Sequence, residues 1–181
     1  MSTIDSVQRS KKNAFEYFVI CLDKWRKDVN PSLCHPFTKL QLHKLLFLAS
    51  SIGAFVDSHP MLDVFNKFYA LQYGPVEIDI YHMMVNNGFT NIQFKGNDCV
   101  ITNSSDIIEN VEINCKTTID AAIESLRNKN ENYVIIPPFQ LVEITHGWTV
   151  WQVANSLASI FDSKMEPMNT FDIINSSIKT F

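Results

Sequence analysis

The segment from about Phe37 to Val56 constrains the fold more than any other part of the chain. Its apolar residues recur at the three- and four-residue spacing of an α-helix: Leu42, Leu45, Leu46, Ala49 and Ile52. Leu48 widens this stripe beyond a single face. A helix that is apolar on more than one side must be covered on more than one side. We therefore expect a mostly α-helical protein in which this helix lies at the centre.

The N-terminal part of the chain predicts one long helix and a small β-hairpin. Residues 7–28 carry an apolar stripe: Phe15, Phe18, Leu22 and Trp25. Residues 91–102 form two β-prone runs on either side of Gly96-Asn97, a dipeptide typical of tight hairpin turns. A short third strand is expected near Asn110–Ile113. These elements add minor α+β character to a helical single domain.

The C-terminal half predicts further helices. One is expected to be capped by Thr117 and to bury Ile119, Ala122, Ile123 and Leu126. The stretch PPFQLVEITHGW predicts a short helix that ends near Gly147. A helix should follow with this apolar face: Val150, Val153, Leu157 and Ile160. The tail NTFDIINSSIKTF can form a last short helix.

A Gly-Pro pair interrupts two apolar segments at Phe68–Met84. The segment before it, Phe65–Leu71, fits a short helix or a strand equally well. Gly74 adopts a positive φ at low cost, which suits the end of an element. Pro75 suits the first turn of a following helix, where no backbone donor is needed. The sequence thus predicts a tight corner with Tyr73 at its apex and a helix after it.

The composition excludes several classes of protein. The formal net charge of −4 argues against a nucleic-acid binder, which usually presents a basic face. No apolar run approaches the length of a membrane span, and the N-terminus lacks the apolar core of a secretory signal. The four cysteines lack metal-ligand spacing, so we expect free thiols, no metal, no cofactor and a cytoplasmic location.

Catalytic motifs are absent from the sequence: it contains no Gly-rich nucleotide loop, nucleophile elbow or HExxH pair. The nearest approach to a catalytic set is His146 with Glu143 three residues earlier on the same helical face, together with Lys44 on an otherwise apolar helix. These three side chains define an enzyme alternative, but a base also needs a nucleophile. Structural roles for His146 and Lys44 are the simpler interpretation.

Three stretches resemble the Panacea-domain family, the SocA/GepA-like group. LQLHKLLFLAS is similar to its KLQKLLYFAQ helix, FYALQYGPVEIDIYHMM to its FEAWxYGPVxPxVY stretch, and LVEITHGWTVWQVA to its LSxLTHxxxPW segment. The family-signature positions are Lys44, Tyr73, Gly74, Pro75, Tyr81, Thr145, His146 and Trp151. The chain departs from the pattern at several positions: His43 replaces a glutamine, Phe47 a tyrosine, Leu71 a tryptophan and Val150 a proline.

The resemblance implies a binding role with no catalytic residues. Members of this family are found in prophages and mobile elements, and many are antitoxins that neutralise a cognate protein toxin by direct contact. Some deliver a toxin to a protease, so a proteolytic adaptor remains an alternative, as does a nucleic-acid-binding regulator. The signature residues are expected to be structural or partner-binding and to cluster in one core. We expect residues 1–35 to form an N-terminal helix packed on a Panacea-like domain of residues 36–181.

Overall fold

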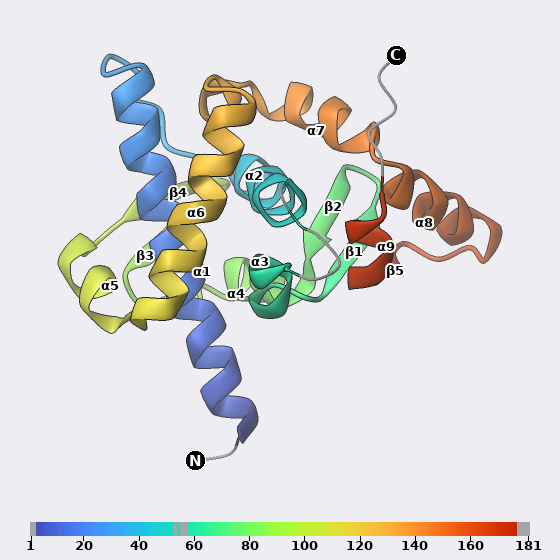
Figure 1. The fold of residues 1–181 in the computed structure, drawn as a ribbon, viewed down its shortest axis with the longest axis horizontal. Coiled ribbons are helices and arrows are strands. Elements are labelled where there is room, and N and C mark those ends of the chain that lie inside the picture. Colours follow the sequence, from blue (N-terminus) through green and yellow to red (C-terminus); the bar gives the residue numbers. More distant parts are fainter. Residues whose placement is uncertain (1–2, 53, 55–57, 177–181) are drawn as a thin grey trace.

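The computed structural model of the protein describes residues 3–52, 54 and 58–176, with side chains from residue 9 onward. Helices dominate the described residues, and two small antiparallel sheets accompany them (Figure 1), as the sequence predicts. In chain order the elements are α1 Thr3–Val29, α2 Lys39–Ser51, α3 Pro60–Val64, β1 Phe68–Leu71, β2 Gly74–Glu77, α4 Ile78–Val85, β3 Ile92–Lys95, β4 Asp98–Ile101, α5 Ser104–Asn110, α6 Ile113–Lys129, the 3-10 turn η1 Tyr133–Ile135, α7 Pro138–His146, α8 Thr149–Ile160, β5 Glu166–Met168 and α9 Thr170–Ile174.

Helix α2 runs through the middle of the molecule, as its apolar pattern predicts (Figure 1). Every residue from Leu42 to Ser51 is buried, and α7, β2, α6 and α3 pack around the helix. The helix is shorter than expected. A capping box between Thr38 and Gln41 begins it, and Ile52, at ψ 120°, already has extended backbone. The expected end at Val56 lies outside the described residues.

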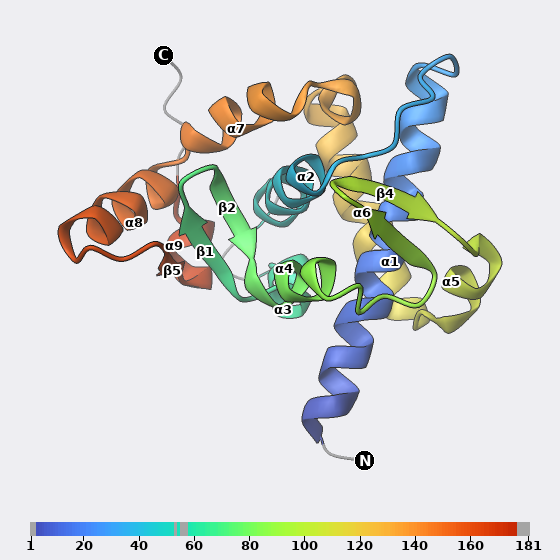
Figure 2. The ribbon, with the colours of Figure 1, turned by 180° about the vertical axis from the view of Figure 1, so that it is seen from behind.

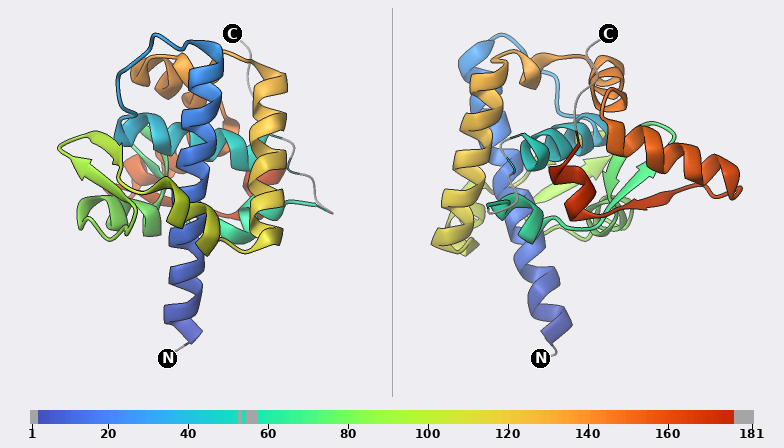
Figure 3. Two further views of the ribbon diagram at one scale, coloured as in Figure 1. Left: turned by 90° about the vertical axis from the view of Figure 1, so that its left-hand side faces the viewer. Right: turned by 45° about the vertical axis from the view of Figure 1, so that its right-hand side comes forward.

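Helix α1 covers one side of this centre and packs against α5, α6 and η1. Its predicted stripe is buried: Phe15, Phe18, Leu22 and Trp25. The N-terminal turns project beyond the other elements (Figure 3). A buried ion-pair network ties α1 to the start of α4, because Lys11 Nζ lies 2.7 Å from Glu77 Oε1 and 2.7 Å from Asp79 Oδ2. Glu77 in turn caps α4 by accepting a bond from the Ile80 amide.

The Gly-Pro corner is a β-hairpin, and the expected helix at Pro75 is wrong. Strand β1 pairs with β2 in the register Leu71↔Gly74, which leaves Gln72 and Tyr73 as a two-residue loop. Gly74 has the expected positive φ, at 95°. Pro75 is tolerated in β2 because that strand lies at the edge of the sheet β2-β1-β5. The helix begins three residues later, at Ile78.

The second sheet is the hairpin β3–β4, which the Gly96-Asn97 turn predicts, and Gly96 has a φ of 62°. The third strand expected near Asn110–Ile113 is wrong, since Asn110 ends α5 and Ile113 begins α6. Thr117 does not cap α6, because it lies one turn inside the helix and its hydroxyl donates to the Ile113 carbonyl. The buried face of α6 is the predicted one: Ile119, Ala122, Ile123 and Leu126.

The C-terminal helices α7, α8 and α9 form an arm with sheet β2-β1-β5 (Figures 1 and 3). The helix predicted from Val150, Val153, Leu157 and Ile160 is α8, but three residues of that apolar stripe, Val153, Leu157 and Ile160, are exposed. The helix instead buries Val150, Trp151, Ala154 and Ala158. None of the described helices combines the length and apolar character that a membrane span requires.

Candidate functional site

The tip of hairpin β1–β2 is the point at which the three sequence motifs meet. Lys44 on α2 is fully buried, and its ammonium donates a hydrogen bond of 2.8 Å to the Pro75 carbonyl. Gly74 leaves room for this arrangement, since an added Cβ would lie 2.9 Å from Lys44 Nζ and 2.8 Å from Thr145 Oγ1. The absence of a side chain at Gly74 therefore lets α2, α7 and the hairpin approach closely.

Burial dominates the electrostatics of Lys44. Removal of the ammonium from water disfavours its charged form and lowers its pKa to about 7. Among the described residues no carboxylate lies within ion-pair distance of Lys44, and the Pro75 carbonyl is its recorded acceptor. A negative group brought next to the Lys44 ammonium would therefore stabilise its charged form.

His146 and Trp151 join the same cluster from α7 and α8. Their rings stack with centroids 3.7 Å apart and planes at 8°, and Trp151 Nε1 donates to the Leu71 carbonyl over 3.1 Å. Burial lowers the pKa of His146, while nearby Glu143 and a hydrogen bond to the backbone of Gln72 oppose this shift. The ring stack and the two hydrogen bonds therefore hold the junction of α7 and α8 against the loop of hairpin β1–β2.

The three side chains of the enzyme alternative have separate environments: Lys44 bonds a carbonyl, and the His146 ring stacks on Trp151. Glu143 is exposed on α7. The Thr145 hydroxyl donates to the Val142 carbonyl within its own helix over 2.9 Å, so it is not paired with His146 as a nucleophile would be. The four cysteines are free thiols, and within residues 3–52, 54 and 58–176 no three metal-ligating side chains converge.

The two signature tyrosines lie at the surface. Tyr73 is 55% exposed at the hairpin tip and meets the ring of Phe139 edge-on, with centroids 6.4 Å apart. Tyr81 on α4 is 39% exposed and lies 6.2 Å from the ring of His43. The structure therefore separates the signature set into a buried cluster around Lys44 and two aromatic side chains beside it on the surface.

An open groove of about 1190 Å³ lies between these tyrosines. Figure 2 views the molecule from the side on which hairpin β1–β2, α4 and hairpin β3–β4 lie in front of α2. We define the groove by its lining residues, which come from segments far apart in the chain: Thr38, Lys39, Leu40, His43, Lys44, Leu71, Gln72, Tyr73, Val76, Tyr81, Met84, Val85, Asn97, Pro138, Phe139, Asn155, Ala158, Ser159, Ser163 and Lys164. Its rim carries Phe139, which is 68% exposed.

His43 also lines the groove, although in the sequence it stands out only as a departure from the family pattern. It is buried, and neither ring nitrogen has a hydrogen-bond partner among the described residues. Burial, together with the charges of Lys44 and Lys39, lowers its pKa to about 3. The residues Lys39, Phe139 and Lys164 carry no sequence signal of a site, because only the folded chain brings them to one groove.

Comparison with known proteins supplies one family. The family model described as "Antitoxin SocA-like, Panacea domain" matches residues 42–152, which is more than half of the chain. The match begins inside α2 and ends inside α8, so it contains the buried cluster around Lys44 and both surface tyrosines. No curated protein matches the chain.

Proposed function

Since this chain belongs to the SocA-like antitoxin family with a Panacea domain, we propose that it neutralises one cognate toxin by direct stoichiometric binding, and that its gene lies in a prophage or mobile element. The family implies a protein toxin as the partner in general terms. Sequestration is the specific mechanism proposed for this chain, with neither turnover of a substrate nor delivery to a protease.

One observation carries this proposal: the groove is bordered by exposed aromatic side chains. Tyr73, Tyr81 and Phe139 surround a concave surface formed by helices α2, α4, α7 and α8 and by parts of both hairpins. Binding energy in protein interfaces concentrates in a few such aromatic anchors near the centre of the contact. A stable interface needs about 800 Å² on each partner, so the proposed contact extends from the groove onto the surface around it.

The buried cluster supports the proposal indirectly. Lys44 and Trp151 hold the hairpin tip against α2 and α8 by donating hydrogen bonds to the Pro75 and Leu71 carbonyls. A rigid tip holds Tyr73 in place before the partner arrives, which reduces the entropy lost on binding. We therefore assign the buried signature residues a positioning role and the exposed tyrosines a contact role.

The test is a titration against the protein encoded beside this chain in its source genome. Protection of cells should scale with the ratio of the two proteins, and size-exclusion chromatography should show a complex of fixed stoichiometry. Phe139→Ser should weaken the complex by tenfold or more, as loss of an aromatic anchor does. Ile113→Ser is the matched control, because Ile113 is 78% exposed on α6 and does not line the groove.

Three results distinguish the mechanism from its rivals. A small fraction of this protein that silences excess toxin without forming a complex would point to an enzyme. Loss of protection in cells lacking their main proteases, with the toxin accumulating, would point to an adaptor. Equal loss of binding in Phe139→Ser and Ile113→Ser would remove the groove from the proposal.

A further inference from the structure

The charges that line the groove are all of one sign. Its charged residues are Lys39, Lys44 and Lys164, and none of its lining residues is an aspartate or glutamate. The chain as a whole has the opposite balance, with 19 acidic residues against 15 basic ones. The groove is therefore a local positive surface on an acidic protein, and it favours a negative ligand.

Lys39 and Lys164 are accessible to a partner, whereas Lys44 is buried at the bottom of the groove. Among the described residues none of the three forms an ion pair, whereas Lys11 and Lys67 are paired with carboxylates elsewhere on the molecule. Lys164 is exposed, and the Lys39 ammonium lies 5.4 Å above the ring of Phe94. Lys44 lies deeper, with the Pro75 carbonyl as its recorded acceptor.

Two buried polar side chains at the groove are incompletely paired: His43 lacks a hydrogen-bond partner among the described residues, and Lys44 has a carbonyl but no carboxylate. His43 is 4% exposed, and both of its ring nitrogens are unpaired within the described part of the chain. Buried nitrogens are nearly always hydrogen-bonded, so such a group needs an explanation. The Lys44 ammonium, beside it in sequence, is fully buried without a carboxylate. A carboxylate brought into the groove would offset the cost of burying that ammonium.

The remaining lining selects a partner that is apolar as well as negative. Tyr81, Met84, Val85 and Phe139 present aromatic and aliphatic surface. Three lysines in a chain of net charge −4 do not form the continuous basic face that nucleic acid requires. Charge and apolar surface together fit a protein segment on which carboxylates alternate with apolar side chains.

We propose that the groove is the toxin-binding site and that it receives an acidic amphipathic segment of the toxin, with carboxylates paired to Lys39 and Lys164 and apolar side chains packed on Tyr81 and Phe139. This inference rests on the proposed function and names the chemistry of the partner. A carboxylate that reaches the base of the groove meets Lys44.

Chemical cross-linking of the complex tests the pairing directly. The full chain and the protein encoded beside it are mixed, isolated by size-exclusion chromatography and treated with a carbodiimide, which joins amines to carboxylates in contact. Mass spectrometry should find Lys39 or Lys164 joined to an aspartate or glutamate of the toxin. Binding should also weaken as salt is raised from low to physiological concentration.

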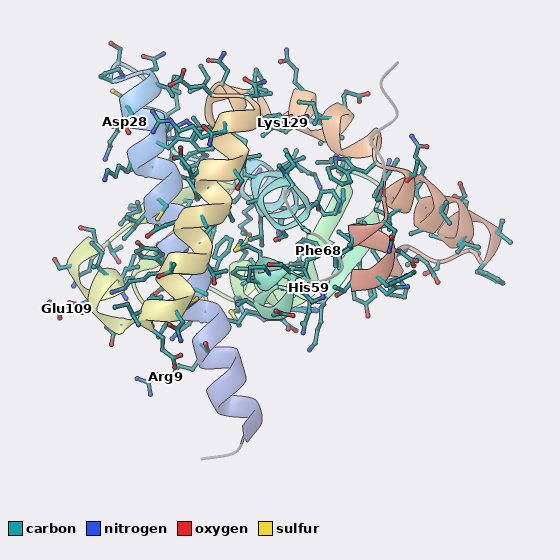
Figure 4. The ribbon with its side chains drawn as sticks, in the orientation of Figure 1. Arg9, Asp28, His59, Phe68, Glu109 and Lys129 are labelled. Atoms are coloured by element: carbon teal, nitrogen blue, oxygen red, sulfur yellow. The ribbon has the colours of Figure 1, made fainter. Side chains whose placement is uncertain are left out.

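Charge reversal supplies the matched variants. The double variant Lys39→Glu with Lys164→Glu should weaken binding by at least tenfold, because like charges then face each other. Lys39 is the first residue of α2, where a glutamate suits the helix dipole, so the loss cannot be ascribed to instability of that helix. Lys129→Glu is the control. Lys129 lies at the end of α6, at the same end of the molecule as Asp28 (Figure 4), and does not line the groove.

The outcomes separate the two proposals. A complex whose cross-links avoid both lysines, and which the double variant forms normally, overturns the groove assignment while the antitoxin function stands. Co-purification of nucleic acid that is lost in the double variant also overturns it, in favour of a phosphate ligand. If wild-type protein forms no complex at all, the proposed function fails and this inference fails with it. The cross-link map uses wild-type protein, so it holds even if a variant folds poorly.

Discussion

Replacement of Gly74 by alanine is the sharpest test of how the hairpin tip is built. Two independent costs act at this position. The backbone has a φ of 95°, which residues with a Cβ rarely adopt. The added Cβ would also lie 2.8 Å from Thr145 Oγ1 and 2.9 Å from Lys44 Nζ. Both neighbours are fully buried and hydrogen-bonded, so neither is free to move aside.

The magnitude follows from these two costs. An L-residue in the left-handed region costs about 1 kcal/mol. Overpacking of a tight core costs roughly 1–3 kcal/mol. We therefore expect Gly74→Ala to lower the free energy of unfolding by about 3 kcal/mol. For a chain of this length each kcal/mol moves Tm by roughly 2–4 °C, so the melting temperature should fall by about 6–12 °C.

The chain contains a matched control in Gly96. Its φ of 62° carries the same backbone cost, but an added Cβ there meets nothing within 4 Å. Gly96→Ala should therefore cost only about 1 kcal/mol. Urea unfolding at pH 7, monitored by circular dichroism, gives the free energy of unfolding of both variants, with the same dependence on urea concentration expected for each. Gly74→Ala should also cost less in a Thr145→Ala background, since that change removes one of the two clashes.

Equal destabilisation by Gly74→Ala and Gly96→Ala would refute this reasoning, because only backbone strain is common to the two sites. If Gly74→Ala destabilised the Thr145→Ala variant as much as the wild type, the added Cβ would not be clashing with Thr145 on α7. Either result would mean that the hairpin tip does not pack on Lys44 and Thr145 as closely as the structure has it.

Three further predictions concern buried charge and thiols. The pKa of His43 falls from 6.5 in the unfolded chain to about 3 in the folded one, so the free energy of unfolding is highest above pH 6.5 and decreases as the pH falls towards 3. At about 1.4 kcal/mol per pKa unit, the decrease is roughly 3 kcal/mol at pH 4. His43→Gln should abolish this pH dependence in urea titrations across the same range. Lys11→Met leaves the buried Glu77 without its cation, while Asp79 keeps Lys67, and should cost about 3–5 kcal/mol; Lys12→Met, which removes one exposed hydrogen bond, should cost under about 1 kcal/mol. A thiol reagent should modify exposed Cys34 within the dead time of mixing and buried Cys99 only on unfolding, because burial raises the pKa of Cys99 to about 12; fast modification of both in the folded protein would contradict the placement of β4.

Local patterns predict much of the fold because helical periodicity is a property of neighbouring residues. The spacing in α1 and α6 indicates which side chains are buried, and Gly96-Asn97 predicts its hairpin from turn chemistry alone. The glycine at position 74 likewise predicts the positive φ that the structure has there. The sequence around Gly74 does not predict whether a helix or a strand follows. Residues 74–77 form strand β2 because they pair with β1, and β1 in turn pairs with β5, almost a hundred residues later in the chain.

What the sequence determined by itself is therefore the helical class, the central helix α2 and the residues of the hairpin tip. The tertiary structure decided which apolar face of α8 is covered, since Trp151 and small alanines allow a close approach to the hairpin while Val153 and Ile160 remain exposed. The tertiary structure also determined that a groove exists and that Lys39, Lys44 and Lys164 line it together. The physical reason is common to both: a local pattern shows that a surface is apolar or charged, but only long-range packing determines which surfaces meet and which stay open to a partner.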